Sequence, residues 1–307
     1  MHLSGRVRGD LFILLAAFIW GVAFYFQKIA MLQIGPLLFL GMRGTVAAAA
    51  LLPFVMAEQG WCRGLAVFRD EPTAVSRHEP DLGGGRYVVA YGMFAGLVFF
   101  VAAAVQQTGI VTATVTNTGF LTALYVVVTP LLFWMVRRQR PGIRIWLAVI
   151  LASTGVWGLS GGSLSALNTG DILVACSSIF WACLIIISGE ASRHAQPMSY
   201  TFVQFVVVAV LGLTAALLLE SIDTSRLLAA AIPILYVGVL SSALTFGLMA
   251  IALQHVPAPR ASILLSMETV FAAMAGFLLL GERLSLISWV GAALILLAVY
   301  IVKGGRE

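Results

Sequence analysis

Ten long apolar segments constrain the fold of this 307-residue chain more than any other feature. A helix that crosses a lipid bilayer needs about 20 mostly apolar residues. The expected spans are residues 10–30, 36–57, 87–107, 112–136, 143–160, 170–189, 199–219, 232–254, 258–280 and 286–302. The segments are too long for membrane strands and do not alternate between polar and apolar residues. The sequence therefore predicts an all-α polytopic membrane protein with ten transmembrane helices.

The composition agrees with a chain that lies mostly in lipid. Hydrophobic residues make up 61% of the sequence and charged residues 10%, whereas soluble domains average about 45–50% and about 25%. A water-soluble fold of this length could not cover so much apolar surface with polar side chains. The net charge is +5, but the basic residues are spread over short loops. We therefore expect a bilayer as the partner and no nucleic acid.

Lysine and arginine gather on one side of the predicted spans. Arg6 and Arg8 precede the first span, and the loops at 58–86 and 137–144 carry four arginines each. The loops near 108–112 and 161–170, on the other side, carry no lysine or arginine. Cytoplasmic loops of membrane proteins are enriched in these residues. The pattern predicts a protein of the inner (plasma) membrane with both termini in the cytoplasm.

The chain also repeats itself at two fixed offsets. The first offset carries Trp20 onto Trp181 and also carries Pro36 onto Pro197. Tryptophan and proline are rare residues in this chain, so chance seldom aligns both at one offset. A second, shorter offset applies further along each copy and carries Trp146 onto Trp289.

The repeat divides the chain into two halves, predicted as residues 1–162 and 163–307. Each half has five spans, and because five is odd, the halves must have opposite orientations in the membrane. Two inverted five-helix repeats are a transporter architecture, with the substrate site near the midplane between them.

Two ionisable side chains fall inside predicted spans, where such groups are candidates for function. Arg43, early in the second span, is interpreted either as an anion contact or gate, or as a structural partner of a carbonyl or carboxylate group. Glu268, in the middle of the ninth span, is interpreted either as a proton carrier or as a hydrogen-bonded structural group. The sequence leaves both alternatives open for each residue.

A polar stripe follows one face of the fourth predicted span. Its members step by four, four, three and four residues: Thr114, Thr118, Thr122, Tyr125 and Thr129. At about 100° per residue, these positions share one helix face, and Asn117 lies beside it. Threonines often bond to their own preceding turn, so such a stripe is also typical of tight helix packing. Tyr125 and Asn117 favour a water-filled cavity lined by Asn117, Thr118, Thr122 and Tyr125.

The repeated tryptophans and two aspartates complete the set of candidate residues. Trp20 and Trp181 lie in the middle of their spans, not at the interfacial belts where tryptophan is common. They are interpreted as symmetry-related walls of a central cavity, with packing between the halves as the alternative. Asp10 and Asp171 stand at the heads of helices, where an acidic side chain suits the helix dipole, and both are expected to act as caps.

Sequence patterns of enzymes are missing. The chain has no HExxH, P-loop or CxxC motif and no pair of aspartates inside spans. We therefore expect no catalytic residues, no metal site, no cofactor and no enzymatic activity.

Segments of both halves resemble the drug/metabolite transporter superfamily, specifically the EamA-type permeases. The resemblance is carried by residues Gln107 to Pro130 and by their counterpart at 252–284, which contains Glu268-Thr269-Val270. It implies ten helices, both termini inside, helices 5 and 10 outside the central cavity, and export of amino acids or other metabolites by alternating access. Thr269 stands where the family commonly has proline, so a break in the ninth helix stays open.

The expected function is that of a secondary transporter of small organic metabolites, specifically an exporter of amino acids or related amphipathic solutes. The alternatives are a membrane channel or sensor and an intramembrane enzyme. A continuous pore lined by rings of charge would favour a channel, and the sequence shows no such rings. The expected partners are a small-molecule substrate and lipid. Proton coupling and a homodimer stay open.

Overall fold

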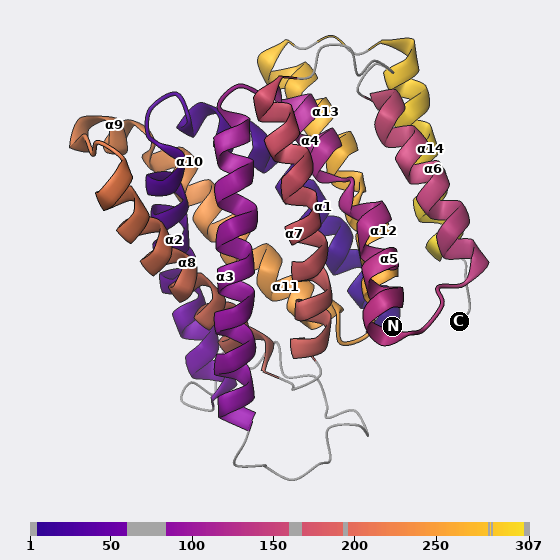
Figure 1. Ribbon diagram of the computed structural model, residues 1–307, viewed down its shortest axis with the longest axis horizontal. Helices are drawn as coiled ribbons and strands as arrows, with labels where there is room; N and C mark the ends of the chain where they lie inside the picture. The colour runs from indigo at the N-terminus through magenta and orange to yellow at the C-terminus, as the bar shows by residue number, and fades with distance from the viewer. Residues whose placement is uncertain are drawn as a thin grey trace.

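The computed structural model of the chain is a bundle of long helices (Figure 1). It describes residues 5–59, 84–159, 168–192, 196–281, 283 and 285–303. Most of the predicted loop at 58–86 lies outside the described residues, as does the boundary predicted between residues 162 and 163. Within the described residues all regular structure is helical.

Each predicted span corresponds to one helix or to a run of consecutive helices. The first half consists of α1 (Gly5–Ala30), α2 (Pro36–Glu58), α3 (Gly84–Ile110), α4 (Val115–Thr122) followed by α5 (Tyr125–Arg137), and α6 (Ile143–Leu159). The second half begins with α7 (Thr169–Ala191) and α8 (Pro197–Leu219). The short α9 (Thr224–Ala229) leads to α10 (Ala231–Leu235), the π-helix η4 (Tyr236–Leu244) and α11 (Thr245–Ala252). The last two spans are α12 (Ala258–Leu265) with α13 (Met267–Leu280), and α14 (Leu286–Lys303).

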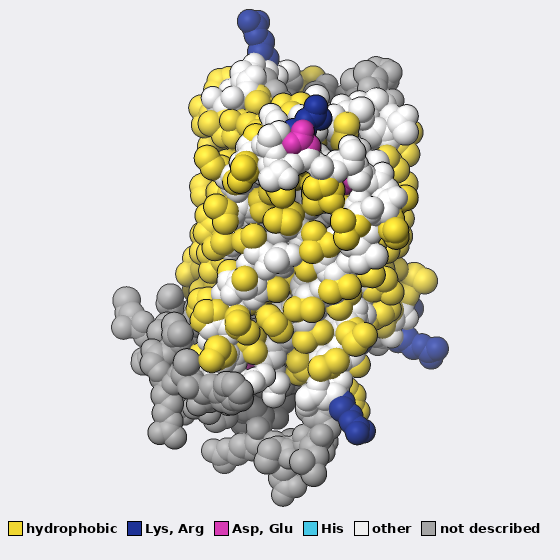
Figure 2. Space-filling model, turned by 90° about the vertical axis from the view of Figure 1, so that its left-hand side faces the viewer, with side chains coloured by type: hydrophobic (Ala, Val, Ile, Leu, Met, Phe, Trp, Pro, Cys, Tyr) yellow, Lys and Arg dark blue, Asp and Glu magenta, His cyan; other side chains and the backbone are white. Residues whose placement is uncertain are grey.

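The sides of the bundle are apolar. In the part of the chain that the structure describes, eight helical spans are long and apolar enough to cross a membrane, and α6 and α14 contain shorter apolar helices. On the face shown in Figure 2, hydrophobic side chains cover the side of the molecule, and lysine and arginine lie toward its ends. Leu217, Leu218 and Leu219 are each more than 70% exposed. A continuous apolar surface of this kind is unfavourable in water but is suited to contact with lipid. The chain is therefore an integral membrane protein.

The two halves are inverted repeats that pack through equivalent contacts. Helices α3 and α5 of the first half pack on α7 of the second half. In the same way, α11 and α13 of the second half pack on α1 of the first half. Likewise α8 packs on α3 as α2 packs on η4, and the peripheral α6 pairs with its counterpart α14. Each contact thus has an equivalent in which the two halves are interchanged. An approximate twofold axis that relates the five-helix halves produces such matched contacts. The predicted fold class is confirmed.

Glycines let α2 and α8 cross at backbone contact. A Cβ atom on Gly41 would lie 2.6 Å from the backbone nitrogen of Leu213, and one on Gly212 would lie 2.6 Å from the nitrogen of Gly41. Only hydrogen fits at these positions. Close approach of small residues is how helices associate in lipid, where the hydrophobic effect contributes little.

The same two helices cap one another. Glu58, at the end of α2, accepts hydrogen bonds from the backbone N–H groups of residues 198 and 199 at the start of α8, at 3.1 and 2.7 Å. Glu220, just after α8, accepts from the N–H groups of residues 37 and 38 at the start of α2, at 2.9 and 2.8 Å. A carboxylate at a helix start satisfies unpaired N–H groups and suits the helix dipole. The reciprocal caps fix α2 and α8 as one unit.

Three spans depart from regular α-helix near the centre of the bundle. The fourth span is interrupted between α4 and α5 at Ala123, and the ninth between α12 and α13 at Ser266, which is the equivalent position by the second offset of the repeat. The ninth helix is therefore broken although Thr269 replaces the family's proline, and the break precedes Thr269. The eighth predicted span, 232–254, contains the nine-residue π-helix η4. No local pattern indicates this π-helix, because π-turns are settled by tertiary contacts, and they are common at functional sites.

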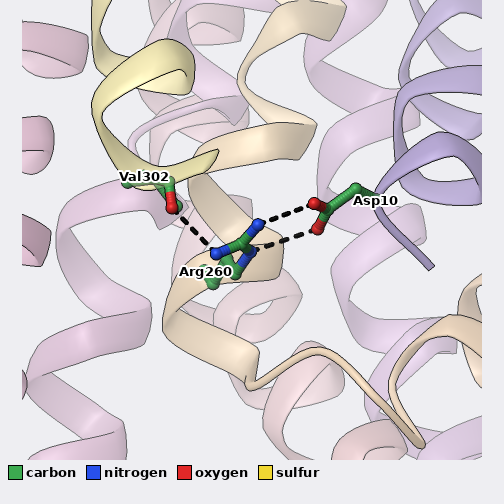
Figure 3. Close-up of polar contacts among 3 residues, drawn as sticks. All are labelled: Asp10, Arg260 and Val302. Atoms are coloured by element: carbon green, nitrogen blue, oxygen red, sulfur yellow. Dashed lines mark hydrogen bonds and ion pairs between the residues drawn. The ribbon is translucent and has the colours of Figure 1, made fainter. Parts of the chain in front are cut away.

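The two aspartates that were predicted to cap helices have different roles. Asp171 takes part in a capping box with Asn168 at the start of α7, so its predicted capping role is confirmed. The prediction for Asp10 was wrong, because α1 begins at Gly5 and Asp10 lies inside it. Its carboxylate is instead buried in an ion pair with Arg260 of α12 (Figure 3).

Candidate functional site

A cavity lies between the two halves and draws its wall equally from both. Its lining residues are Trp20, Phe24, Gln27, Arg43, Gln106, Thr122, Tyr125, Trp181, Leu184, Ile185, Ser241, Phe246, Met249 and Glu268. The cavity holds about 520 Å³ of space between side chains, open solvent included. Of the residues described for α6 and α14, none lines the cavity, as the family resemblance implied.

Arg43 brings the one cationic side chain of this lining. It is buried in α2, and its Nε and Nη2 groups donate to the hydroxyl of Ser242 at 3.1 and 2.9 Å. Its guanidinium carbon lies 5.3 Å from the ring centroid of Phe99, a distance at which the ring attracts a cation. No carboxylate is within ion-pair distance among the described residues. The structural alternative was a carbonyl or carboxylate partner for Arg43, whereas the partner that the described contacts show is a hydroxyl group.

Trp20, Trp181 and Phe246 line the cavity and belong to a cluster of aromatic rings that also contains Phe99 and Phe205, which are not among the lining residues. Phe246 lies at the centre, with its ring centroid 4.9 Å from that of Trp20, 5.1 Å from Phe99 and 5.4 Å from Phe205. The ring of Trp181 packs edge-on against Phe99 at 5.2 Å. Aromatic rings at these distances attract one another, so the cluster gives the cavity an apolar wall.

The two repeated tryptophans lie in equivalent places but differ in hydrogen bonding. The indole N–H of Trp20 donates to the carbonyl of Ser241 at 2.8 Å and lies 2.7 Å from the hydroxyl of Thr245. The indole N–H of Trp181 is buried and has no hydrogen-bond partner among the described residues. A buried donor without a partner is costly. The free N–H of Trp181 is therefore available to a bound molecule, whereas that of Trp20 is used by the protein.

Tyr125 and Glu268 form a polar pair beside this wall. The second offset of the internal repeat carries Tyr125 onto Glu268, so the two occupy equivalent positions just after the breaks in the fourth and ninth spans. They lie within electrostatic range of each other. The hydroxyl of Tyr125 and the carboxylate of Glu268 interact with each other, although the hydroxyl and the Oε1 atom make no hydrogen bond of standard geometry to a described residue. Nearby, Gln106 donates to the hydroxyl of Thr122 at 2.8 Å.

The structure brings six of the eight predicted site residues together in the cavity lining: Trp20, Arg43, Thr122, Tyr125, Trp181 and Glu268. Asn117 and Thr118 are not among the lining residues. Thr118 donates its hydroxyl to the carbonyl of Thr114 at 2.7 Å, and the amide of Asn117 donates to Asp171 at 3.2 Å. Both polar groups are thus used near the start of α4, away from the cavity.

Sequence reasoning missed more than half of the lining. Gln27 and Gln106 carry a usable signal, since an amide inside a predicted span is unusual, although neither was singled out. Phe24, Leu184, Ile185, Phe246 and Met249 carry no such signal, because an apolar side chain in a membrane helix looks the same whether it faces lipid, a neighbouring helix or a cavity. Ser241 belongs to the π-helix and was missed with it. No group of His, Cys, Asp or Glu side chains in the described part of the chain could hold a metal ion.

Comparisons with known proteins point to one family. The model of the EamA-like transporter family matches the chain twice, over residues 7–161 and 168–304. An "uncharacterized transporter" of Archaeoglobus fulgidus is 30% identical over 301 residues, which cover 97% of this chain and 86% of that protein. The "uncharacterized transporter YwfM" of Bacillus subtilis is 29% identical, covering 96% and 93%.

Two further comparisons are more distant. The threonine/homoserine exporter RhtA of Escherichia coli (strain K12) is 32% identical over 165 residues, which cover 51% of this chain and 52% of RhtA. One solved crystal structure superposes with a TM-score of 0.73 over 97% of both chains at 14% identity, which supports the fold alone. Since the family model covers both halves and the named relatives are transporters, the chain is a membrane transporter that belongs to the EamA-like transporter family.

Proposed function

We propose that this protein is a secondary transporter that exports amino acids or related amphipathic solutes by alternating access between its two inverted halves. The observation that carries the proposal is the cavity between the halves. It contains one cation, Arg43, and one acid, Glu268, set in an aromatic wall, and the described contacts include no ion pair between them. Such a site has a pole for each charge of a zwitterion and an apolar surface between them.

Arg43 is the proposed contact for the carboxylate of the substrate. Its bonds to Ser242 use Nε and Nη2, so Nη1 remains for a substrate oxygen. A guanidinium group pairs with carboxylates through short, charge-assisted hydrogen bonds. Because Arg43 is buried, such a bond is only weakly screened by water. An anionic group entering the cavity thus gives the guanidinium the charged partner that its described contacts lack.

Glu268 and the aromatic residues take the rest of the proposed substrate. The unpaired Oε1 atom of Glu268 accepts from an ammonium group, with the hydroxyl of Tyr125 beside it. The rings of Trp20, Trp181 and Phe246 cover an apolar side chain, and the free indole N–H of Trp181 adds a donor. A proton and an ammonium group compete for the same carboxylate, and this competition is the proposed route by which a proton gradient drives export.

Location and direction are part of the same proposal. We place the protein in the inner membrane with both termini in the cytoplasm, on the basis of the positive-inside pattern of its loops. The name of RhtA, a threonine/homoserine exporter that is similar over half of this chain, supports export and amino acids.

The test is amino-acid analysis of the growth medium. Cells that overproduce the protein should release at least one amino acid or amphipathic derivative faster than cells carrying an empty vector. Cells that produce equal amounts of Arg43→Gln should release it at the vector rate. Equal release from all three strains, with the protein present in the membrane, would contradict the proposal.

A further inference from the structure

A buried ion pair joins three helices at the end of the bundle where α1 begins. Arg260, near the start of α12, donates from Nε and Nη2 to the two carboxylate oxygens of Asp10 on α1, at 3.1 and 2.6 Å. Its Nη1 group donates to the carbonyl of Val302 on α14 at 2.8 Å (Figure 3). The Asp10 and Arg260 side chains are only 3% and 4% exposed. All three nitrogens of the guanidinium group are thus used to close this end.

At the opposite end, the equivalent positions are joined by a hydrogen bond and not by an ion pair. The first offset of the internal repeat carries Asp10 onto Asp171, and the second offset carries Asn117 onto Arg260. In place of an ion pair, the amide of Asn117 donates one hydrogen bond of 3.2 Å to Asp171. If that bond breaks, Asp171 still accepts from the backbone N–H of Asn168 at 2.9 Å.

Both contacts lie on helix faces that continue into the wall of the cavity. On α1, Ala17 lies between Asp10 and the cavity residue Trp20, and its side chain is fully buried. On α7, the equivalent Ser178 lies between Asp171 and Trp181 and is 2% exposed. Ala17 and Ser178 are therefore matched positions between each end contact and the cavity wall, at which opening of either end can be measured.

We propose that Asp10 and Arg260 form a latch that holds their end of the transporter closed, so that the end held by Asn117 and Asp171 opens more readily. The inference rests on the proposed alternating access between the halves. Separating a buried ion pair leaves two unpaired charges in apolar surroundings, whereas an amide–carboxylate hydrogen bond breaks at lower cost. Unequal contacts at the two ends make one open state more populated than the other before any substrate binds.

Thiol labelling at the matched positions tests the latch without a substrate. In a variant with Cys62, Cys176 and Cys183 replaced by serine, single cysteines are placed at Ala17 or at Ser178. The purified proteins react with a charged methanethiosulfonate reagent, and labelling is followed by mass spectrometry. Because both positions are buried alike, the Ser178→Cys protein should label at least about tenfold faster than the Ala17→Cys protein. Equal rates would overturn the proposal.

Exchanging the side chains at positions 260 and 117 gives a second, independent test. Arg260→Asn makes the latched end like the other, and should raise labelling at position 17 toward the rate at position 178. Asn117→Arg gives Asp171 an arginine and should slow labelling at position 178. The second variant breaks no buried ion pair, so it decides the question even if Arg260→Asn fails to fold. Unchanged labelling in the Asn117→Arg protein would overturn the latch. Unequal labelling in a protein that releases no amino acid would keep the latch and contradict the proposed function.

Discussion

At the scale of single residues, the cavity is defined by polar groups whose hydrogen bonds are incomplete. Trp181, Tyr125 and Glu268 each have a buried polar atom without a partner among the described residues. Such atoms are rare in folded proteins, because an unpaired buried donor or acceptor costs about 1–3 kcal/mol. These three residues line the cavity, whereas the other residues with such atoms, Gln107, Thr129, Ser153 and Gln204, do not. Substitutions at the three lining positions should separate binding from stability.

The two tryptophans provide a matched pair for this purpose. Trp20→Phe removes a donor that bonds to Ser241, so it should destabilise the protein by about 1 kcal/mol while leaving the ring in the aromatic wall. Trp181→Phe removes an N–H that the protein does not use, so it should lower thermal stability less than Trp20→Phe does and should weaken substrate binding. Thermal unfolding in detergent and the concentration dependence of transport measure the two effects. The opposite assignment, with Trp181→Phe the less stable protein, would contradict the proposed role of its N–H.

Glu268 tests energy coupling. Glu268→Gln keeps the shape and hydrogen-bonding capacity of the side chain but cannot release a proton. This variant should still exchange substrate across vesicle membranes at high substrate concentration, yet fail to accumulate it when a pH gradient is imposed. Asp223→Asn, on the residue that precedes the exposed helix α9, is the control and should accumulate substrate as the wild type does. A Glu268→Gln protein that responds to the pH gradient would leave Glu268 with a structural role only.

At the scale of helices, the packing of α2 on α8 depends on two glycines, Gly41 and Gly212, which have no side chain at the crossing point. Gly41→Ala would place a methyl group 2.6 Å from a backbone nitrogen of α8, and overpacking of this kind costs about 1–3 kcal/mol. A Cβ atom on Gly85 of α3 would meet nothing within 4 Å. Thermal unfolding should therefore show a lower midpoint for Gly41→Ala and an unchanged or higher one for Gly85→Ala. Equal midpoints would contradict the close packing of α2 on α8 at Gly41.

The helices show why sequence reasoning succeeded for the fold and only in part for the site. Bilayer thickness sets the length of an apolar span, so the ten spans could be predicted from run lengths with small errors at their ends. A polar stripe says which side chains share a face, but not where that face points. Thr122 and Tyr125 reach the cavity, whereas Thr118 bonds to its own preceding turn. The π-helix and the ion pair between residues 10 and 260 depend on contacts between segments far apart in the sequence, which no local pattern records.

At the scale of the whole molecule, the even number of spans makes a topological prediction. Reporters fused within the loop at 58–86 and after residue 307 should both report the cytoplasm, and a reporter inserted in the loop at 161–167 should report the opposite side. The reason is that inverted five-helix halves place the first and last helix ends on one face. A fusion after residue 307 that reports the periplasm would contradict the proposed orientation.

Transport through the cavity between the halves is the central claim, and counterflow in proteoliposomes tests it most directly. Vesicles preloaded with unlabelled threonine, homoserine or phenylalanine are diluted into the same amino acid in radiolabelled form. We predict that the wild-type protein accumulates label for at least one of these, as does Arg144→Gln, which changes an exposed arginine of α6. Arg43→Gln should lose nearly all of this exchange, because the cavity then has no cation for the substrate carboxylate. Exchange by Arg43→Gln at the wild-type rate would contradict the account.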